Sequence, residues 1–317
     1  MNVIFFGTPP IAAEVLTYLL QKGVNIVAVV SKPDRPKGRS LIPVATPVKL
    51  TALAFNSSMP VYQPEFVSAP EFSQILEAHH ADLFVVVAYG EIIKQHLLDM
   101  PRLGCINLHV SLLPKYRGAA PIQRCIMEGE TESGVTVMHM VKKMDAGDII
   151  ETVKIPIGPE TTFGELEYSL SEVGKTTLWK VIEDFQAGII KRIPQNPEQI
   201  TFAPKIELED CEIHWQWPAQ KIHNLIRGVN PYPGAWCYVR IKDEKKRLKI
   251  NLSRIRSSSG EPPGTILSNH KENLIIATGT EALELLDVRL EGKKTMSSRD
   301  LILGISLKDL SFRDLVI

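Results

Sequence analysis

The sequence has little cysteine and no excess of either charge. Only four cysteines occur among the 317 residues, at positions 105, 125, 211 and 237, and no two of them form a C-x-x-C pair. Such scattered thiols beside apolar stretches predict reduced, packed side chains and argue against a disulfide framework or a cysteine zinc site. The 36 Lys and Arg residues balance the 36 Asp and Glu residues. A nucleic-acid partner would therefore have to be held by local basic patches.

The sequence also has no long apolar run and no glycine-rich phosphate loop. No stretch approaches the roughly 20 apolar residues that a membrane-spanning helix requires. The N-terminus, MNVIFFGTPP, has no basic segment of the kind that begins a signal peptide, and its apolar run stops at Pro9. We therefore expect a cytoplasmic protein without a membrane partner. The first strand-to-helix turn reads GTPPIA, with no G-x-G-x-x-G, which argues against a dinucleotide-dependent dehydrogenase.

What the first half of the chain does contain is an alternation of strand and helix signals. Short apolar runs predict buried strands at residues 2–7, 25–31, 81–90, 104–109 and 133–141. Helical spacing of apolar residues predicts helices from Pro10 and at 48–56, 70–80, 91–98 and 163–186. Strands and helices in this order predict an α/β fold with a doubly wound, mostly parallel sheet.

The second half has a different pattern, and the length of the chain suits about two domains. Residues 190–208 are rich in proline and polar residues without a sustained period, so we expect a linker between a domain at 1–189 and one at 209–317. After a helix signal at 219–228, short strand-like segments separated by turn residues predict a small OB-like β-barrel. These segments are 235–241, 247–255, 264–269, 272–278 and 282–290.

Two polar residues at the end of the predicted strand 104–109 are the first candidates for a functional site. Asn107 and His109 lie two residues apart, so strand periodicity directs both side chains to the same side. Ligands of open α/β sheets bind beyond the carboxyl ends of the strands. There an amide can stabilise an oxyanion and an imidazole can transfer protons. From position alone, a structural histidine beside a turn-forming asparagine fits the pattern at least as well.

The surrounding run of residues 104–124, GCINLHVSLLPKYRGAAPIQR, resembles the signature of the formyltransferases that use 10-formyltetrahydrofolate. In that family an Asn-x-His pair precedes a Ser-Leu-Leu-Pro loop, and a catalytic Asp follows about one crossover later. Asn107 and His109 match the pair, and Asp145 in KMDAGDII matches the acid. Val110 departs from the small residue or proline that is common there, and its stiffer side chain predicts a slightly different loop path.

The resemblance implies acyl transfer from a folate carrier to an amine, without a metal. Asn107 would donate to the developing oxyanion, His109 would assist proton transfer, and Asp145 would support the imidazole. Taken alone, the Asp-Ala-Gly-Asp sequence at Asp145 is also a good surface turn. Folate is expected to lie against two segments, namely Ser111, Leu112, Leu113 and Pro114, and the strand end at Ala88, Tyr89 and Gly90.

A basic loop suggests which amine accepts the formyl group. Residues 31–49 hold five basic residues against one acid, and their prolines make helix unfavourable. The loop resembles the insertion with which the tRNA-specific branch of the family reaches the acceptor stem. Its candidate contacts are Arg35, Lys37 and Arg39. A basic loop by itself is more often only a solvated surface.

The second predicted domain adds another basic segment. Residues 240–256 hold eight basic residues against two acids, and Lys245, Lys246 and Arg247 are its candidate tRNA contacts. Local matches to the same branch of the family run in order from TFAPKI at 201–206 to EGKKTMSSRDLI at 291–302. Together these features favour a tRNA acceptor, and the resemblance implies that this acceptor is initiator methionyl-tRNA.

Two other functions fit parts of the sequence. An aminosugar-nucleotide formyltransferase would share Asn107, His109 and Asp145, but the basic loop and the matches after residue 200 argue against it. A catalytically silent RNA-binding module would explain the basic segments and leave these three residues without a purpose. We expect a monomer from the neutral, mixed surface.

Overall fold

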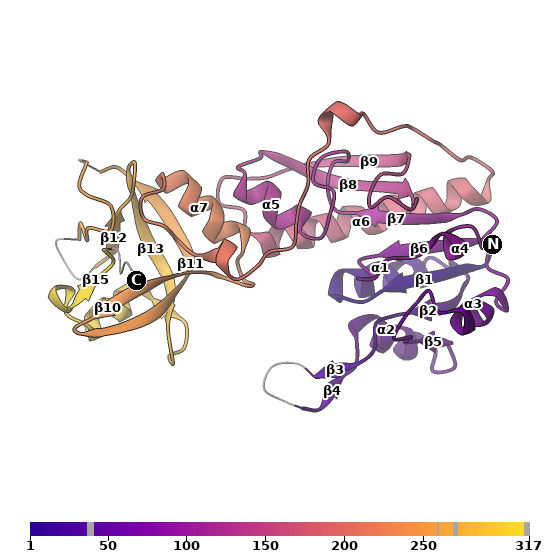
Figure 1. Cartoon of the computed structure of the whole chain (residues 1–317), viewed down its shortest axis with the longest axis horizontal. Helices are drawn as coiled ribbons and strands as arrows, with labels where there is room; N and C mark the ends of the chain where they lie inside the picture. Colours follow the sequence, from indigo (N-terminus) through magenta and orange to yellow (C-terminus); the bar gives the residue numbers. More distant parts are fainter. Residues whose placement is uncertain (37–40, 259, 269–271, 314–317) are drawn as a thin grey trace. The chain divides into compact units, whose positions relative to one another are not determined.

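The structure is a computed structural model that describes residues 1–36, 41–258, 260–268 and 272–313 (Figure 1). The chain forms two compact units. The first comprises Met1–Pro121, Glu132–Ile155 and Glu167–Ala203, and the second comprises Ile122–Thr131, Pro156–Leu166 and Pro204–Ile317. Within the described ranges, no helix is both long enough and apolar enough to cross a membrane.

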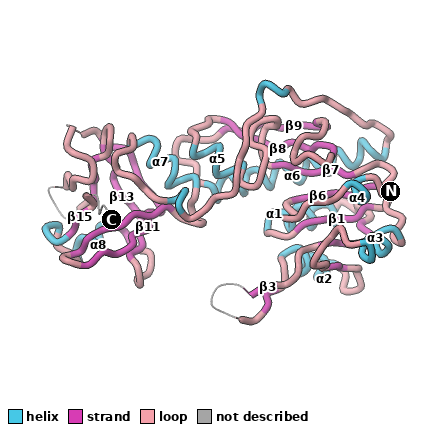
Figure 2. Tube along the Cα trace, viewed as in Figure 1, coloured by secondary structure: helices cyan, strands magenta, loops and turns pink. Residues whose placement is uncertain are grey.

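The first unit is built on a seven-stranded sheet with the order β5-β2-β1-β6-β7-β8-β9 (Figures 1 and 2). The strands are β1 (Val3–Gly7), β2 (Ile26–Val30), β5 (Val61–Tyr62), β6 (Leu83–Val87), β7 (Cys105–His109), β8 (Glu132–His139) and β9 (Ile149–Pro156). Strands β5, β2, β1, β6 and β7 pair in parallel, and β8 runs antiparallel to β7. The predicted doubly wound, mostly parallel sheet is confirmed. Strand β9 was not predicted.

Helices of the first unit pack on this sheet, and contacts along β7 show which faces α3, α4 and α6 cover. The helices of this unit are α1 (Pro10–Gln21), α2 (Pro47–Phe55), α3 (Pro70–Glu77), α4 (Gln95–Leu98) and most of α6 (Phe163–Gln186), whereas α5 (Pro121–Met127) belongs to the second unit from Ile122 on. Helix α6 approaches β7 closely, because a Cβ on Gly174 would lie 3.0 Å from Leu108 Cδ2. Phe72 of α3 and Leu97 of α4 instead share a buried cluster with Cys105. Cys105 and Leu108 alternate along β7, so α6 and the α3–α4 pair cover opposite faces.

The predicted helix 91–98 is wrong in its first half, because within it Gln95–Leu98 is the helical part. The carboxylate of Glu91 accepts a hydrogen bond from the Val67 backbone N–H at 2.9 Å and pairs with Lys32 Nζ at 2.7 Å. These long-range contacts compete with helix formation in the first half of the predicted element. Apolar spacing could not reveal them.

The second unit is a curled antiparallel sheet with the order β12-β13-β11-β10-β15, with β14 paired to β13 (Figure 1). Its strands are β10 (Ala235–Ile241), β11 (Glu244–Arg256), β12 (Leu274–Ala277), β13 (Ala282–Leu290), β14 (Met296–Ser297) and β15 (Leu310–Ser311). Register shifts between Ile250 and Ser253 bend the long strand β11. The predicted small OB-like β-barrel domain is confirmed, with its sheet curled into a half-barrel. The predicted strand 264–269 does not form a strand in its described part, which is joined to β12 by an isolated bridge from Ile266 to Ile276 and by three backbone hydrogen bonds of residues 264–267.

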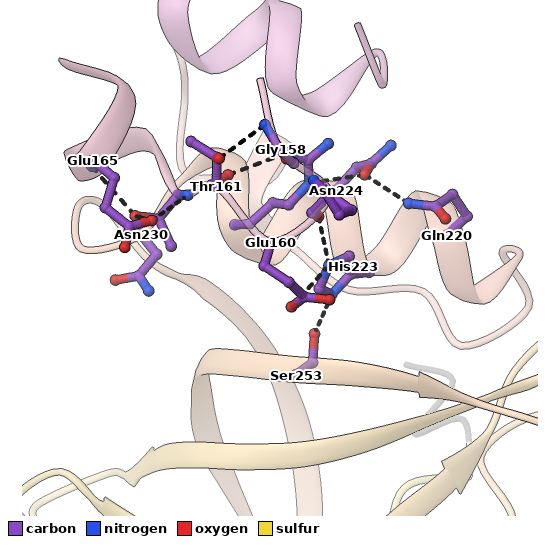
Figure 3. A network of polar contacts seen from close by, with 12 residues as sticks. Gly158, Glu160, Thr161, Glu165, Gln220, His223, Asn224, Asn230 and Ser253 are labelled. Carbon is purple, nitrogen blue, oxygen red and sulfur yellow. Dashed lines mark hydrogen bonds and ion pairs between the residues drawn. The ribbon is translucent and has the colours of Figure 1, made fainter. Parts of the chain in front are cut away.

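Helix α7 (Ala219–Gly228) joins this sheet through a buried histidine (Figure 3). His223 is 4% exposed, and its Nδ1 lies 3.0 Å from Ser253 Oγ on β11. Its Nε2 lies 3.2 Å from the Pro159 carbonyl. A carbonyl can only accept, so Nε2 carries the proton and Nδ1 accepts from the Ser253 hydroxyl. The neutral imidazole therefore satisfies both of its hydrogen-bonding positions.

This histidine should make stability depend on pH. Burial lowers the pKa of His223, although the nearby Glu160 carboxylate opposes the shift. The unfolded chain then takes up the proton first, so stability should be lost as the pH falls below about 6.5. We expect His223→Gln to show a smaller difference in Tm between pH 7.5 and pH 5.5 than the parent. His80→Asn, at an exposed position, should keep the parent's difference, and an unchanged difference in His223→Gln would refute the assignment.

Candidate active site

The candidate residues of β7 lie where the sequence placed them. Asn107 is opposite Val86 of β6, and His109 is opposite Thr136 of β8. They share the parity of Cys105, so they lie on the face of β7 opposite to the α6 contact of Leu108. The neighbouring strand β6 ends at Val87 and runs parallel to β7, so both carboxyl ends meet at this edge. This is the edge at which ligands of open α/β sheets bind.

Asn107 has a side-chain amide that is available to a ligand. It is partly exposed, and in the described part of the chain its amide makes no hydrogen bond. A structural asparagine at the end of a buried strand would be expected to pair both its N–H and its carbonyl groups. The free amide therefore favours a ligand-binding role over a structural one.

His109 is buried and held in one tautomer. It is 6% exposed, and its Nε2 lies 3.0 Å from the Tyr116 carbonyl oxygen. Because that oxygen can only accept, Nε2 carries the proton of the neutral ring and Nδ1 holds the free lone pair. Nδ1 faces the Asp145 carboxylate at 3.8 Å. The ring is thus ready to accept a proton at Nδ1, and the resulting imidazolium would face a carboxylate.

Asp145 lies in a tight turn whose backbone is in the left-handed region, with φ of 49°. Its Oδ2 accepts a hydrogen bond from the Gly118 backbone N–H at 2.8 Å, and the same oxygen faces His109. A left-handed aspartate is uncommon and must be held by its surroundings. The structure thus brings Asn107, His109 and Asp145 toward one edge of the sheet, although their catalytic roles stay predictions.

The predicted folate loop is ordered by a buried threonine. Thr136 Oγ1 donates to the Ser111 carbonyl at 2.7 Å and accepts from the Leu113 N–H at 3.2 Å. Ser111 Oγ donates to the Lys115 carbonyl, and the Leu113–Pro114 peptide is cis. Ser111, Leu113 and Pro114 are buried, whereas Leu112 is partly exposed. Of the four loop residues, Leu112 is therefore the side chain best placed to touch a ligand.

At the end of β6 a ligand can reach backbone groups, whereas the side chain of Tyr89 is buried. Ala88 and Gly90 are exposed and have φ of 45° and 87°. Tyr89 is 2% exposed and packs edge-on against Phe6, while its carbonyl accepts from Thr8 Oγ1. Burial also raises the pKa of the Tyr89 hydroxyl. Of the three predicted folate contacts, the Tyr89 side chain is thus part of the core.

The basic loop is only partly described, because Lys37 and Arg39 lie outside the described residues. Arg35 begins a short β3–β4 ladder (Arg35–Pro36 and Pro43–Val44) and pairs with Glu65 at 2.6 Å. The base of the loop is held by Asp34, whose carboxylate accepts from Gln63 and Lys49 at 2.6 Å each. These hydrogen bonds lower the pKa of Asp34, with the Gln63 bond the largest cause.

In the second unit, only two of the three predicted basic contacts share a face. Tyr238 lies opposite Arg247 on the neighbouring strand, and the guanidinium of Arg247 is 4.0 Å from the centre of the Trp236 ring. Lys245 Nζ lies 4.0 Å from the Tyr238 ring centre. Lys246 has the opposite parity and pairs with Glu244 at 2.6 Å. The face of Lys245 and Arg247 thus combines cations with aromatic rings.

Sequence reasoning missed two residues that surround Asp145. Gln195 Nε2 donates to the Asp145 carbonyl at 2.9 Å, and its Oε1 accepts from Arg117 Nη2 at 2.6 Å. Gln195 falls in the predicted linker, and the composition of that segment gave no sign of its contacts. Arg117 lies in the motif run 104–124, and its near-complete burial, at 5% exposed, is unusual for arginine.

The thiols and potential metal ligands of the described residues give no competing site. Burial raises the pKa of Cys211 to about 11 and that of Cys105 still further, so neither is a thiolate near neutral pH. No group of three or more His, Cys, Asp or Glu side chains is placed to hold a metal among them. The chemistry available at the β7 edge is therefore a free amide donor, an imidazole of fixed tautomer and a carboxylate.

Comparison with known proteins agrees with this set of functional groups at the β7 edge. The profile described as "Formyl transferase" matches residues 1–182, and the profile "Formyl transferase, C-terminal domain" matches residues 205–306. The chain belongs to the formyl transferase family. The resemblance noted in residues 104–124 is thereby confirmed as family membership.

Relatives in this family match the chain over nearly its whole length. It is 61% identical over 312 residues to "Methionyl-tRNA formyltransferase" of Protochlamydia amoebophila, covering 98% of each chain. It is 43% identical over 309 residues to the protein of that name from Chlamydia caviae, covering 96% of each. These relatives therefore align with both units of the chain.

Solved structures show the same fold at low identity. The sugar 3N-formyl transferase WlaRD superposes with a TM-score of 0.66 and 19% identity, covering 93% of this chain and 99% of that one. HypX from Aquifex aeolicus in complex with tetrahydrofolic acid superposes with a TM-score of 0.64 and 17% identity. The match covers 95% of this chain and 47% of HypX, so this chain spans about half the length of HypX.

Proposed function

We propose that this chain transfers a formyl group from 10-formyltetrahydrofolate to the α-amino group of initiator methionyl-tRNA. The observation that supports it most is 61% identity over 98% of the chain to a protein named methionyl-tRNA formyltransferase. A related fold has been solved with tetrahydrofolic acid, which supports a folate-derived donor. The proposal assigns catalysis to residues 1–189 and tRNA binding to residues 209–317, while the predicted linker 190–208 contributes Gln195 to the contacts of the first unit. The expectation of a cytoplasmic monomer stays a prediction.

The β7 edge suits this reaction. The exposed backbone of Ala88 and Gly90 offers a folate the amide-type partners that its polar ring needs, which leaves the free amide of Asn107 for the formyl group. The carrier supplies the formyl group. Asn107 donates a hydrogen bond to the formyl oxygen as negative charge develops there, which is where such donors act most strongly.

The remaining steps concern protons. The methionyl amine must lose a proton to attack, and His109 accepts it at Nδ1, the nitrogen left free by the Tyr116 carbonyl. Asp145 then faces the imidazolium across 3.8 Å and stabilises its charge. As the tetrahedral intermediate collapses, the bond between the formyl carbon and N10 breaks, and the imidazolium returns its proton to N10, so that tetrahydrofolate leaves as the neutral amine. No covalent enzyme intermediate is required, since an amine is itself the nucleophile.

The test is formyl transfer by the purified protein. It would be incubated with 10-formyltetrahydrofolate and, in separate reactions, charged initiator Met-tRNA, free methionine and an aminosugar nucleotide. We expect formylated Met-tRNA only, and none with His109→Ala. Transfer to the aminosugar would keep the site and refute the acceptor. Transfer to no acceptor would leave a folate hydrolase or a silent RNA-binding module as the better account.

The face of Lys245 and Arg247 gives a prediction for tRNA binding. Arg247 stacks on Trp236, so it can present its charge to a phosphate backbone beside an aromatic surface. We expect Arg247→Ala to raise the KM for Met-tRNA several-fold, leave kcat unchanged and reduce the slope of log binding against log salt by about 1. Lys246→Ala is the matched control, because Lys246 lies on the other face and is paired with Glu244. Equal effects of the two substitutions would contradict the assignment.

A further inference from the structure

Gln195 holds the turn of Asp145 with every hydrogen-bonding position of its side-chain amide. Its Nε2 donates to the carbonyl oxygens of Asp145 at 2.9 Å and Gly147 at 2.7 Å. Its Oε1 accepts from Nε of Arg117 at 3.1 Å and from Nη2 of Arg117 at 2.6 Å. One amide thus joins three segments of the first unit that are far apart in the sequence.

Only an amide fits this position. Two carbonyl oxygens require two N–H donors, and a guanidinium requires an acceptor, so the side chain must do both. A carboxylate would satisfy Arg117 and would place its second oxygen against two carbonyl oxygens. An apolar side chain of the same length would leave the buried Arg117 without this acceptor.

The backbone is fixed both at Arg117 and close to Gln195 itself. The Arg117 backbone pairs with residues 201–203, through its N–H to the Thr201 carbonyl at 2.9 Å and its carbonyl to the Ala203 N–H at 2.8 Å. Close to Gln195 in the sequence, Ile193 exchanges two backbone hydrogen bonds with Ile149 at the start of β9. Gln195 is therefore held in place between two backbone pairings.

The turn that Gln195 grips is tightly packed. A Cβ on Gly147 would lie 1.7 Å from the His139 carbonyl oxygen, and a Cβ on Gly118 would lie 2.6 Å from that of Ala203. Gly118 in turn donates its N–H to the Asp145 carboxylate. Gln195 thus holds the main chain of Asp145, and Gly118, which directly follows Arg117, holds its carboxylate.

We propose that Gln195 is a positioning residue, which with Arg117 holds the Asp145 carboxylate against Nδ1 of His109. This inference rests on the proposed formyl transfer and assigns no contact between Gln195 and a substrate. Without the amide, the strained turn at Asp145 loses two of the hydrogen bonds that oppose its relaxation. A displacement of about 1 Å at a catalytic group is enough to cost about 10²-fold in rate.

The test compares Gln195→Met, Gln195→Glu and the control Asn196→Ala in formyl transfer to Met-tRNA. We expect kcat to fall about 10- to 100-fold in both Gln195 variants, with KM for Met-tRNA within twofold of the parent. Among the described residues, the Asn196 side chain accepts from the nearby Glu198 N–H at 3.0 Å and makes no contact with the turn of Asp145, so its alanine variant should keep the parent's kcat. Parental kcat in Gln195→Met would overturn the inference, and so would an equal loss in Asn196→Ala.

A double substitution separates positioning from general loss of structure. If Gln195 acts through Asp145, Gln195→Met should cost less than about twofold when Asp145 is already asparagine. A purely structural role would lower the rate by the same factor in both backgrounds and would overturn the inference. A crystal structure of Gln195→Met gives a readout that does not depend on the acceptor, and an undisplaced Asp145 carboxylate there would also overturn it. Inactivity of the parent toward every acceptor would refute the proposed function instead.

Discussion

Replacing Asn107 with alanine is expected to lower kcat for formyl transfer to Met-tRNA by about 10²- to 10³-fold, or about 3–4 kcal/mol of barrier. The amide is partly exposed at the carboxyl end of β7 and has no hydrogen-bond partner in the described chain. Its removal therefore breaks no hydrogen bond among the described residues and should change Tm little. What it removes is a donor to the oxygen on which charge develops, so the loss should fall on kcat more than on KM.

The control for this prediction keeps the shape and removes the donor. Asn107→Asp has nearly the same volume and no N–H group, so it should lose at least as much activity as the alanine variant. The measurement is single-turnover formylation of charged initiator tRNA, with Tm recorded for each variant. A loss in Asn107→Ala of less than about tenfold, or one matched by a collapse of Tm, would show that Asn107 is not the oxyanion donor.

The elements that sequence patterns predicted well are those whose apolar residues decide the structure locally. Helix α6 runs over Phe163–Gln186 and strand β10 over Ala235–Ile241, each with the bounds expected from the sequence. A 24-residue helix gives many repeats of its apolar period, and a buried strand gives an uninterrupted apolar run. The pair Asn107 and His109 was found for the same reason, because strand alternation fixes their common face.

The elements that were missed are decided by contacts far along the chain. Strand β9 reads IIETVKIP, which contains charged residues and a proline, and most of its residues are only partly buried. Half of the predicted helix at 91–98 is lost because Glu91 pairs with Lys32 and with the Val67 backbone. Gln195 lies 50 residues from Asp145 and 78 from Arg117. Local sequence patterns carry no information about contacts between residues so far apart in the chain. The segment around Gln195 was therefore predicted to be a linker, although Gln195 holds the turn that contains Asp145.

Asp145→Asn is expected to lower kcat about 10²- to 10³-fold with little change in stability, because the substitution separates two roles of one carboxylate. The first role is structural, since Oδ2 accepts the Gly118 N–H at 2.8 Å, and an asparagine oxygen can accept the same bond. The second is electrostatic, since the carboxylate faces His109 Nδ1 at 3.8 Å. Asparagine offers no negative charge to an imidazolium there, so the proton-bearing state loses its stabilisation.

Asp148→Asn is the matched control, because it makes the same substitution three residues further on, directly before β9. Asp148 has no part in the contact with His109, so its variant should retain the parent's kcat. Alanine at position 145 should lose both roles, and so should lower Tm as well as kcat. If Asp145→Asn keeps the parent's rate while Asp145→Ala does not, the carboxylate serves only to hold Gly118. The imidazole would then work without its charge partner, and Gln195 would position a turn and not a catalytic carboxylate.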